Sequence, residues 1–335
     1  MSSQSSVAPE ETFPLGPDSL TWKYFGDNRI FLTAPWSGAM QNMHPKLGAA
    51  VEEHSRFFDE RWQRLNRSTY PIAGVVYDGD RAPQTGAEVR DYHRDIKGVD
   101  RNGNRYHALD PDVFYWAHAT FFMGIVNFAE HFAGGLSEAD KRQLFDEHVD
   151  WYRMYGVSMR PVPRSWEDFQ EYWEDMCRNV LEDNQATRDV LDLGSLDHPF
   201  FLPIPEAAWP ALRPVVATVY TWLTVGMFDE PVRRRMGYRW TIADRIAFKG
   251  VAAATTITSS IAMRFVPERL MLHPRAMAAL DRARGKTPTD APLPQTPRMF
   301  APPVDEWDSP RHYNPYRAEC PVGRVQRPIG TGSSN

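Results

Sequence analysis

Residues 106–120, YHALDPDVFYWAHAT, combine a clear helix start with a histidine among aromatic residues. Asp110 is a residue type favoured at the N-cap, and Pro111 suits the first helical position because a missing N–H costs nothing there. Apolar residues and one histidine then recur at spacings of three and four, which places them on one helix face: Phe114, His118, Phe121, Phe122 and Ile125. A histidine in such a face either satisfies both ring nitrogens within the protein or binds a ligand, and this alternative decides the function.

The composition excludes several classes of protein. A chain of 335 residues can bury a large core, and its formal net charge of -5 gives no reason to expect nucleic acid or an anionic membrane surface as a partner. The two cysteines, Cys177 and Cys320, lie far apart, so they form neither a disulfide framework nor a cysteine metal site. This pattern favours a reducing compartment.

The sequence carries no membrane-spanning or secretory pattern. The N-terminus lacks the basic and apolar regions of a secretory signal. The longest uncharged apolar run, residues 215–228, has about 14 residues, whereas a membrane-spanning helix needs about 20. We therefore expect a cytoplasmic protein, with peripheral membrane contact and the oligomeric state left open.

The two ends of the chain differ from its body. Residues 1–20 are rich in Ser, Pro and Glu, which is typical of disorder, and residues 286–335 carry many prolines, which exclude long helices and strands. The body, residues 21–285, is expected to form one all-α domain. Three aromatic residues of the Pro-rich tail are candidate anchors onto this body: Trp307, Tyr313 and Tyr316.

Apolar spacing and capping residues predict helices almost throughout the body. Thr85 and Glu88 have the form of a capping box, and Gly98 is a natural C-cap for the helix that this box would open. The only strand candidate is residues 74–77. We expect helices near 36–58 with a start or kink at His44-Pro45, over 85–98, from Asp110, from Ser137 through Tyr155, from Ser165, and over 205–228, 230–236 and 241–263.

The predicted helix over 85–98 has a cationic face. Arg90, His93, Arg94 and Lys97 stand at i, i+3, i+4 and i+7, so they are expected on one side. A solvated basic face is the ordinary interpretation. The functional interpretation is an anion clamp beside a reactive centre, because arginine pairs with carboxylates and stabilises developing negative charge.

The spacing of other residues excludes several familiar chemistries. The chain has no Glu-x-x-His pair for a di-iron site, no His-Glu-x-x-His, no Cys-x-x-Cys-His, no phosphate-binding glycine loop and no Gly-x-Ser-x-Gly elbow. His118 on its own is either a core histidine or a ligand, and the other histidines carry weaker signals still. A single histidine on an apolar helix, with cations close by in sequence, is what non-covalent haem b requires.

Several motifs, taken in order, resemble a known family. They are Arg90-Asp91-Tyr92-His93-Arg94-Asp95-Ile96-Lys97-Gly98, Tyr106-x-Ala108-Leu109-Asp110-Pro111 and Trp116-x-His118-Ala119-Thr120. Around them, QNMHP at 41–45, VEEHS at 51–55 and WEDFQEYW at 166–173 agree as well. Together they resemble the catalytic domain of rubber oxygenases (latex clearing proteins), a family that includes the farnesyl-chain-cleaving oxygenase of mycophenolic acid biosynthesis. The resemblance covers roughly residues 22–284.

The resemblance implies an all-α, globin-like fold around haem b, with O2 as oxidant. His118 matches the iron ligand of the family, and Arg90 matches an arginine on the distal side of the haem. His93 and Arg94 stand where rubber oxygenases carry a lysine and a threonine, so His93 could be a sixth ligand or a proton donor. Phe114 and Phe122 are the expected apolar contacts of the cofactor. The departure at position 93 and the missing secretion signal argue against rubber as the substrate.

The resulting hypothesis is a haem b-dependent oxygenase that acts with O2 on a hydrophobic small-molecule or isoprenoid-like substrate, with oxidative C=C cleavage among its reactions. Arg90, His93 and Arg94 are the candidate catalytic residues. The candidate cofactor-binding residues are His118 as iron ligand, together with Arg90, His93, Phe114 and Phe122. The alternatives are a haem peroxidase or peroxygenase, a haem-binding protein without catalysis, and a helical scaffold without cofactor.

Overall fold

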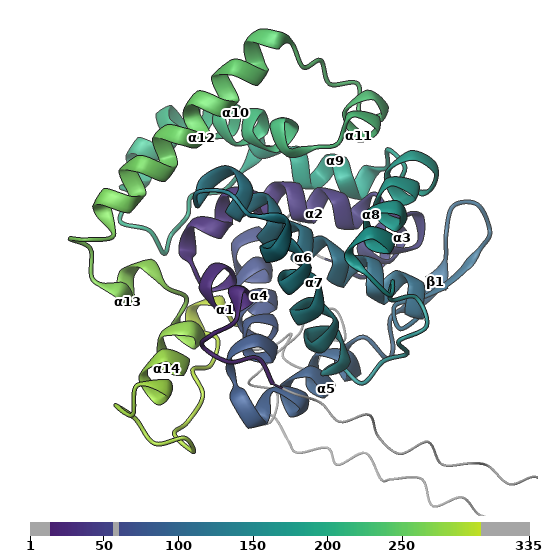
Figure 1. Ribbon diagram of the computed structural model, residues 1–335. Helices are drawn as coiled ribbons and strands as arrows, with labels where there is room; N and C mark the ends of the chain where they lie inside the picture. The colour runs from purple at the N-terminus through teal and green to yellow at the C-terminus, as the bar shows by residue number, and fades with distance from the viewer. Residues whose placement is uncertain (1–13, 56–59, 303–335) are drawn as a thin grey trace, which may run out of the picture.

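The computed structural model describes residues 14–55 and 60–302, and its fold is all-α, as the sequence predicts. Within these residues the only sheet is an antiparallel hairpin of β1 (Lys97–Val99) and β2 (Arg105–His107). Figure 1 shows helix α6 in the middle of the molecule, with the other helices arranged around it. None of the described helices is long and apolar enough to cross a membrane.

Helix α6 (Pro111–Phe132) is the central element, and it begins where the sequence predicts. The Asp110 side chain accepts a hydrogen bond from the backbone N–H of Asp112 at 3.1 Å, and Pro111 is the first helical residue. Most of its 22 residues are buried, because neighbours pack against it on several sides. A helix that is apolar nearly all round requires such a position.

The remaining elements follow in chain order. Before α6 lie α1 (Leu20–Phe25), η1 (Asn28–Thr33), α2 (Ala34–Asn42), α3 (Pro45–His54), α4 (Arg61–Tyr77), η2 (Gly79–Arg81) and α5 (Ala82–Tyr92). After it lie α7 (Glu138–Arg153), α8 (Trp166–Asp175), the π-helix η3 (Met176–Val180), α9 (Gln185–Leu191), η4 (Leu193–Ser195) and η5 (Glu206–Ala208). The chain continues with α10 (Trp209–Met227), α11 (Glu230–Arg235), α12 (Ile242–Ala262), α13 (Glu268–Met271), α14 (Pro274–Ala283) and η6 (Arg298–Phe300).

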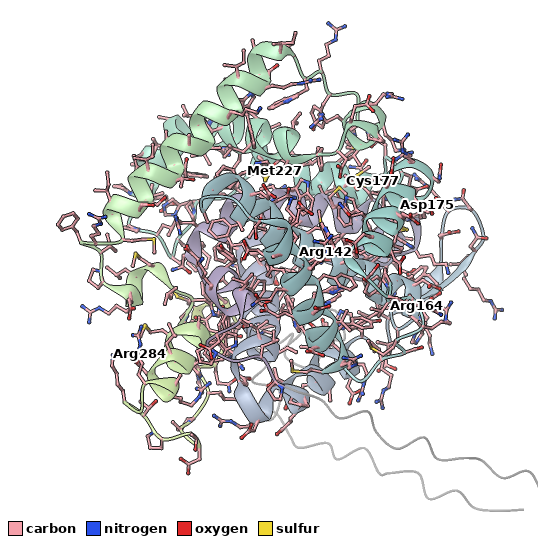
Figure 2. The ribbon with its side chains drawn as sticks, in the orientation of Figure 1. Arg142, Arg164, Asp175, Cys177, Met227 and Arg284 are labelled. Atoms are coloured by element: carbon pink, nitrogen blue, oxygen red, sulfur yellow. The ribbon has the colours of Figure 1, made fainter. Side chains whose placement is uncertain are left out.

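Most predicted helix starts are confirmed. Ser137 and Thr241 each form a complete capping box with the aspartate three residues on, and Ser165 caps α8 through the backbone N–H of Asp168. Of the start or kink predicted at His44-Pro45, the structure has the start, because α2 ends at Asn42 and α3 begins at Pro45 with His44 as its N-cap. Cys177, labelled in Figure 2, is buried in η3, and its carbonyl accepts a hydrogen bond from Arg235 of α11 at 2.6 Å.

The strand prediction for residues 74–77 is wrong. These residues form the last turn of α4, and Gly74, Val75, Val76 and Tyr77 are all buried. A short apolar run has the same pattern in a buried strand and in a helix that is covered on all sides. Here α5 and α14 both pack against α4, so every face of this turn is covered.

The prediction of a helix over 85–98 is wrong at both ends. Helix α5 begins three residues earlier, at Ala82, and the Thr85 hydroxyl donates to the Asp78 carboxylate at 2.7 Å instead of capping. The helix ends at Tyr92, His93 is its C-cap, and Lys97 belongs to β1. Arg90, His93, Arg94 and Lys97 therefore do not share one helix face, because the backbone turns after His93 to enter the hairpin.

The division into residues 1–20, 21–285 and 286–335 stays a prediction. Residues 1–13 and 303–335 lie outside the described residues, and so do the proposed anchors Trp307, Tyr313 and Tyr316 and also Cys320. The described part of the tail, residues 286–302, contains only the short helix η6. Phe300 of η6 is buried, and its carbonyl accepts a hydrogen bond from Arg67 at 2.9 Å.

A buried ion pair attaches α14 to the body. The Arg275 guanidinium pairs with the Asp78 carboxylate, and the two side chains are 7% and 0% exposed. The same carboxylate accepts the hydrogen bond from Thr85, while Arg282 of α14 donates to the carbonyl of Tyr77 at 2.7 Å. Asp78 thus holds the end of α4, the start of α5 and α14 together.

We predict that Arg275→Met lowers the free energy of unfolding by about 3–5 kcal/mol, because it leaves a buried carboxylate without its cation. Urea denaturation followed by circular dichroism measures the change. The control is Arg142→Met, because Arg142 and its partner Glu167 are each 55% exposed and such pairs contribute little. Equal stabilities of the two variants would contradict the prediction.

Candidate active site

A cavity of about 390 Å³ is lined mainly by residues that precede α7, together with Tyr155 and His273. This volume is within the range of about 300–1,000 Å³ that is usual for small-molecule sites. Its walls come mainly from α1 to α6, and they are mostly apolar. The apolar residues include Phe25, Ile30, Leu47, Val51, Leu65, Ile72, Val89, Ile96, Val113, Phe114, Ala117 and Phe121. Polar and charged residues also border the cavity, among them Asp27, Glu60, Arg64, Arg67, His93, His118 and His273.

His118 of α6 borders the cavity as a neutral imidazole with one free nitrogen. Its side chain packs against the rings of Trp151 and Tyr155, with centroid distances of 4.7 and 5.6 Å. Its Nε2 donates to the backbone carbonyl of His148 at 3.1 Å, while Nδ1 is buried and has no partner among the described residues. Burial lowers the pKa of His118 from 6.5 to about 3. A neutral ring with one N–H fixed by a carbonyl is the form in which histidine binds metals.

His148 of α7 lies behind His118 and does not border the cavity. The two rings are 4.9 Å apart, and burial lowers the pKa of His148 well below its ordinary value. Its Nε2 lies 3.1 Å from the hydroxyl of Tyr115. His148 therefore contributes its backbone carbonyl, which orients the ring of His118, rather than a ligand atom in the cavity.

His93 also borders the cavity, at the C-terminal end of α5. Its Nδ1 donates to the carbonyl of Val89 at 2.7 Å, so Nε2 carries the lone pair. Burial lowers the pKa of His93. The ring meets Phe114 edge-on at 5.8 Å, and Phe114 in turn contacts Tyr155 at 5.3 Å. Because its only N–H is already bonded, neutral His93 is better suited to accept a hydrogen bond or bind a metal than to donate a proton.

The other sequence-predicted site residues lie away from the cavity wall. Arg90 pairs with Asp91 and donates to the carbonyl of Tyr155 at 3.3 Å, and Arg94, 65% exposed, pairs with the same aspartate. Phe122 is packed between His148 and Phe169, at ring distances of 4.5 and 5.0 Å. The structure thus brings His93, Phe114 and His118 together around the cavity, and places Arg90, Arg94 and Phe122 elsewhere.

A comparison with protein families matches residues 22–257 to the family described as "ER-bound oxygenase mpaB/B'/Rubber oxygenase, catalytic domain". The chain belongs to this family. The oxygenase domain so identified includes α1 to α11 and most of α12, and hence nearly the whole cavity wall. No curated protein and no solved structure matches this oxygenase. Family membership agrees with the resemblance that the sequence motifs show and makes the chain an oxidoreductase.

Most polar cavity residues of the oxygenase were not predicted from the sequence, and Arg64 and His273 are two of them. Arg64 of α4 borders the cavity, where burial lowers the pKa of its guanidinium. His273 lies at the N-cap of α14, beyond the end of the family match. Its Nδ1 accepts from the backbone N–H of Arg275 at 3.2 Å, so Nε2 bears a hydrogen, and this buried atom has no partner among the described residues. A buried donor of this kind calls for a ligand or a water molecule as acceptor.

No spacing in the sequence relates position 273 to position 118, so the only local signal was the His-Pro start of a helix. The oxygenase also has, within residues 14–55 and 60–302, no group of three or more His, Cys, Asp or Glu residues that could hold a metal ion. Three separate imidazoles, of His93, His118 and His273, border the cavity.

Buried neutral histidines predict that acid destabilises the oxygenase. Burial lowers the pKa of His44 and His273 from 6.5 to about 4, and that of His118 to about 3. Between pH 6.5 and 4 the unfolded chain binds protons that the folded chain does not, so the free energy of unfolding falls as the pH falls. Each histidine contributes a slope of up to about 1.4 kcal/mol per pH unit.

We expect His118→Leu to reduce the slope of the free energy of unfolding against pH by the contribution of one histidine. Urea denaturation between pH 4.5 and 7.5 measures the free energy of unfolding of both proteins. A variant with the wild-type slope would show that His118 is accessible to protons in the folded state.

Proposed function

We propose that the protein is a haem b-dependent oxygenase that uses O2 on a hydrophobic small-molecule or isoprenoid-like substrate, with oxidative C=C cleavage among the reactions of this class. The observation that carries the proposal is the free Nδ1 of His118 beside an apolar cavity. A porphyrin brings four nitrogen ligands to its iron, so one imidazole is enough to complete the attachment.

The residues of the cavity fit this cofactor. His118 supplies the lone pair, and Phe114 and Ala117 belong to the same wall of α6. Arg64 of α4 also borders the cavity, and its guanidinium is the candidate partner for the carboxylates of a haem. Bound haem supplies the binding and activation of dioxygen, while the protein sets ligation, access and electrostatics.

The chain's own residues then have separate tasks. The carbonyl of His148 keeps the ring of His118 in one orientation, and the aromatic residues around that ring exclude water. His93 presents an acceptor nitrogen on the same cavity, as a second ligand or as a partner of a bound molecule. Catalytic roles for Arg90 and Arg94 require both side chains to leave Asp91 and turn inwards.

The cavity also supports a substrate class. Its apolar wall favours a hydrocarbon chain or ring, and the N–H of His273 favours a single hydrogen-bond acceptor on that molecule, such as a carbonyl or hydroxyl oxygen. We therefore expect His273→Leu to raise KM at least several-fold for a substrate with such an oxygen. The matched hydrocarbon without the oxygen should bind to both proteins equally well. An equal rise in KM for both substrates would show that His273 does not have this role.

We predict that His118→Ala purified from haem-replete cells loses the Soret absorption of the wild type, because the iron has lost its protein ligand. The control is His131→Ala, because His131 is on the same helix but packs against Phe248 outside the cavity. This variant should keep the wild-type spectrum. Imidazole added to His118→Gly should restore the band.

An unchanged Soret band in His118→Ala would contradict the assignment of His118 as the iron ligand. If the wild-type protein binds no haem, the whole proposal fails. Turnover with O2 in the presence of catalase separates the oxygenase from a peroxidase or peroxygenase, which needs H2O2.

His93 favours one second candidate, a haem-binding protein without catalysis. Two neutral imidazoles, of His93 and His118, border the same cavity, and if both were to hold the iron, no ligand position would remain for O2. A six-coordinate spectrum that becomes five-coordinate in His93→Ala, together with no oxidation of any substrate by the wild type, would favour this candidate.

A further inference from the structure

Helix α12 turns its most apolar side away from the protein. Only Phe248 and Ala252 of its 21 residues are buried, and α12 packs against α6 and α10. In Figure 1 it is the long green helix along the upper left edge, and Figure 2 shows its side chains along the outline of the molecule. Four isoleucines are nevertheless exposed, with fractions of 75%, 68%, 60% and 54%: Ile242, Ile246, Ile257 and Ile261.

These isoleucines form one continuous stripe. At 100° per residue they fall, with the small residues between them, within a sector of about 100° opposite Phe248 and Ala252. The stripe consists of Ile242, Ala243, Ile246, Gly250, Ala253, Ile257, Ser260 and Ile261. A surface helix normally directs such a stripe to the core and its polar side to water, so this arrangement indicates that another surface covers α12.

The stripe is symmetric about its own midpoint, between Val251 and Ala252. Ile246 and Ile257 are equally far from this midpoint, and so are Ile242 and Ile261. Gly250 and Ala253 are likewise equally far from the midpoint, and so are Ala243 and Ser260. A two-fold axis through the midpoint would set each residue against its pair on an antiparallel second helix. A closed two-fold dimer requires this kind of self-complementary surface.

The residues at the centre of the stripe are small enough to let a second helix approach closely. A Cβ placed on Gly250 would meet nothing within 4 Å, so nothing inside the described chain requires glycine there. Glycine inside a helix costs about 1 kcal/mol relative to alanine. With Ala253 beside it, Gly250 lets two helix backbones come near each other while the isoleucines fill the space towards both ends.

The area is sufficient for a dimer. A helix of 21 residues is about 30 Å long and about 10 Å wide, so the outward half of its cylindrical surface measures roughly 500 Å² in each copy. The total of about 1,000 Å² reaches the size at which a specific interface is credible. Other apolar residues are exposed nearby in the chain or on the helix that packs against α12: Phe265 after the end of α12, and Val215 and Val219 on α10.

We propose that the outward stripe of α12 is the interface of a two-fold homodimer in which the two α12 helices pack antiparallel. A lipid surface suits the stripe less well, because its centre holds Gly250 and Ala253 instead of large apolar side chains. The inference is independent of the cofactor, because its tests measure the assembly of two chains and none of them measures activity.

Cysteine cross-linking tests the register. In a Cys320→Ser background, the double variant Ile246→Cys/Ile257→Cys should form a disulfide-linked dimer under mild oxidation. Each single variant should stay monomeric on a non-reducing gel, because two copies of one position lie 11 residues apart, about 16 Å along the axis, which is too far for a disulfide. The matched control pair, Ala247→Cys/Thr258→Cys, is exposed on the flank of the same helix and should not cross-link.

Sedimentation gives the second test. The wild type should sediment at twice the chain mass of 38.4 kDa, and Gly250→Phe at the mass of one chain with unchanged circular dichroism, because the monomer has room for the ring. Cross-links in the single variants, or a Gly250→Phe protein that stays dimeric, would overturn the proposal. So would a monomeric wild type, and if such a monomer sedimented with phospholipid vesicles, a membrane would be the occupant.

Discussion

The hydrogen bond from Nε2 of His118 to the carbonyl of His148 is the interaction on which the site depends. It joins the central helix α6 to α7 and places the one N–H of a neutral imidazole where it cannot serve a ligand. A helix carbonyl has a second lone pair, so His148 can accept this bond without losing its place in the helix. The lone pair on Nδ1 is what remains for chemistry. Trp151 and Tyr152 of α7 and Tyr155, just after its end, surround the same ring and keep water from it.

Local signals in the sequence predicted the elements that local physics determines. Asp110, Ser137, Ser165 and Thr241 all cap the helices that were expected of them, because a cap needs only backbone groups two or three residues away. Thr85 has the same local pattern and fails as a cap. Its hydroxyl is taken by Asp78, a carboxylate that the buried Arg275 fixes from nearly 200 residues away in the sequence. Tertiary contacts of this kind are invisible to a pattern of four residues.

The site shows the same division. His118, His93 and Phe114 could be found because they belong to motifs on neighbouring segments, and the cavity does bring them together. The predicted basic helix face does not form, because the chain leaves α5 after Tyr92 to form the hairpin before α6. Arg64 and His273 come from distant parts of the chain, and only the packing of α4 and α14 beside α1 brings them to the cavity. Only the assembled fold contains the information that identifies them.

The position of His273 links the stability of the fold to the composition of the cavity. Its backbone N–H donates to the carbonyl of Gly26 at 2.8 Å, and a side chain at Gly26 would overlap Ala276 and Tyr77, so α14 lies directly against the chain after α1. Arg275, two residues on, forms the buried pair with Asp78. Because a rigid helix start holds both residues, the ion pair that stabilises this corner also fixes the N–H of His273 at the cavity wall. The family match ends before α14, so His273 is a cavity residue outside the part of the chain that the family model covers.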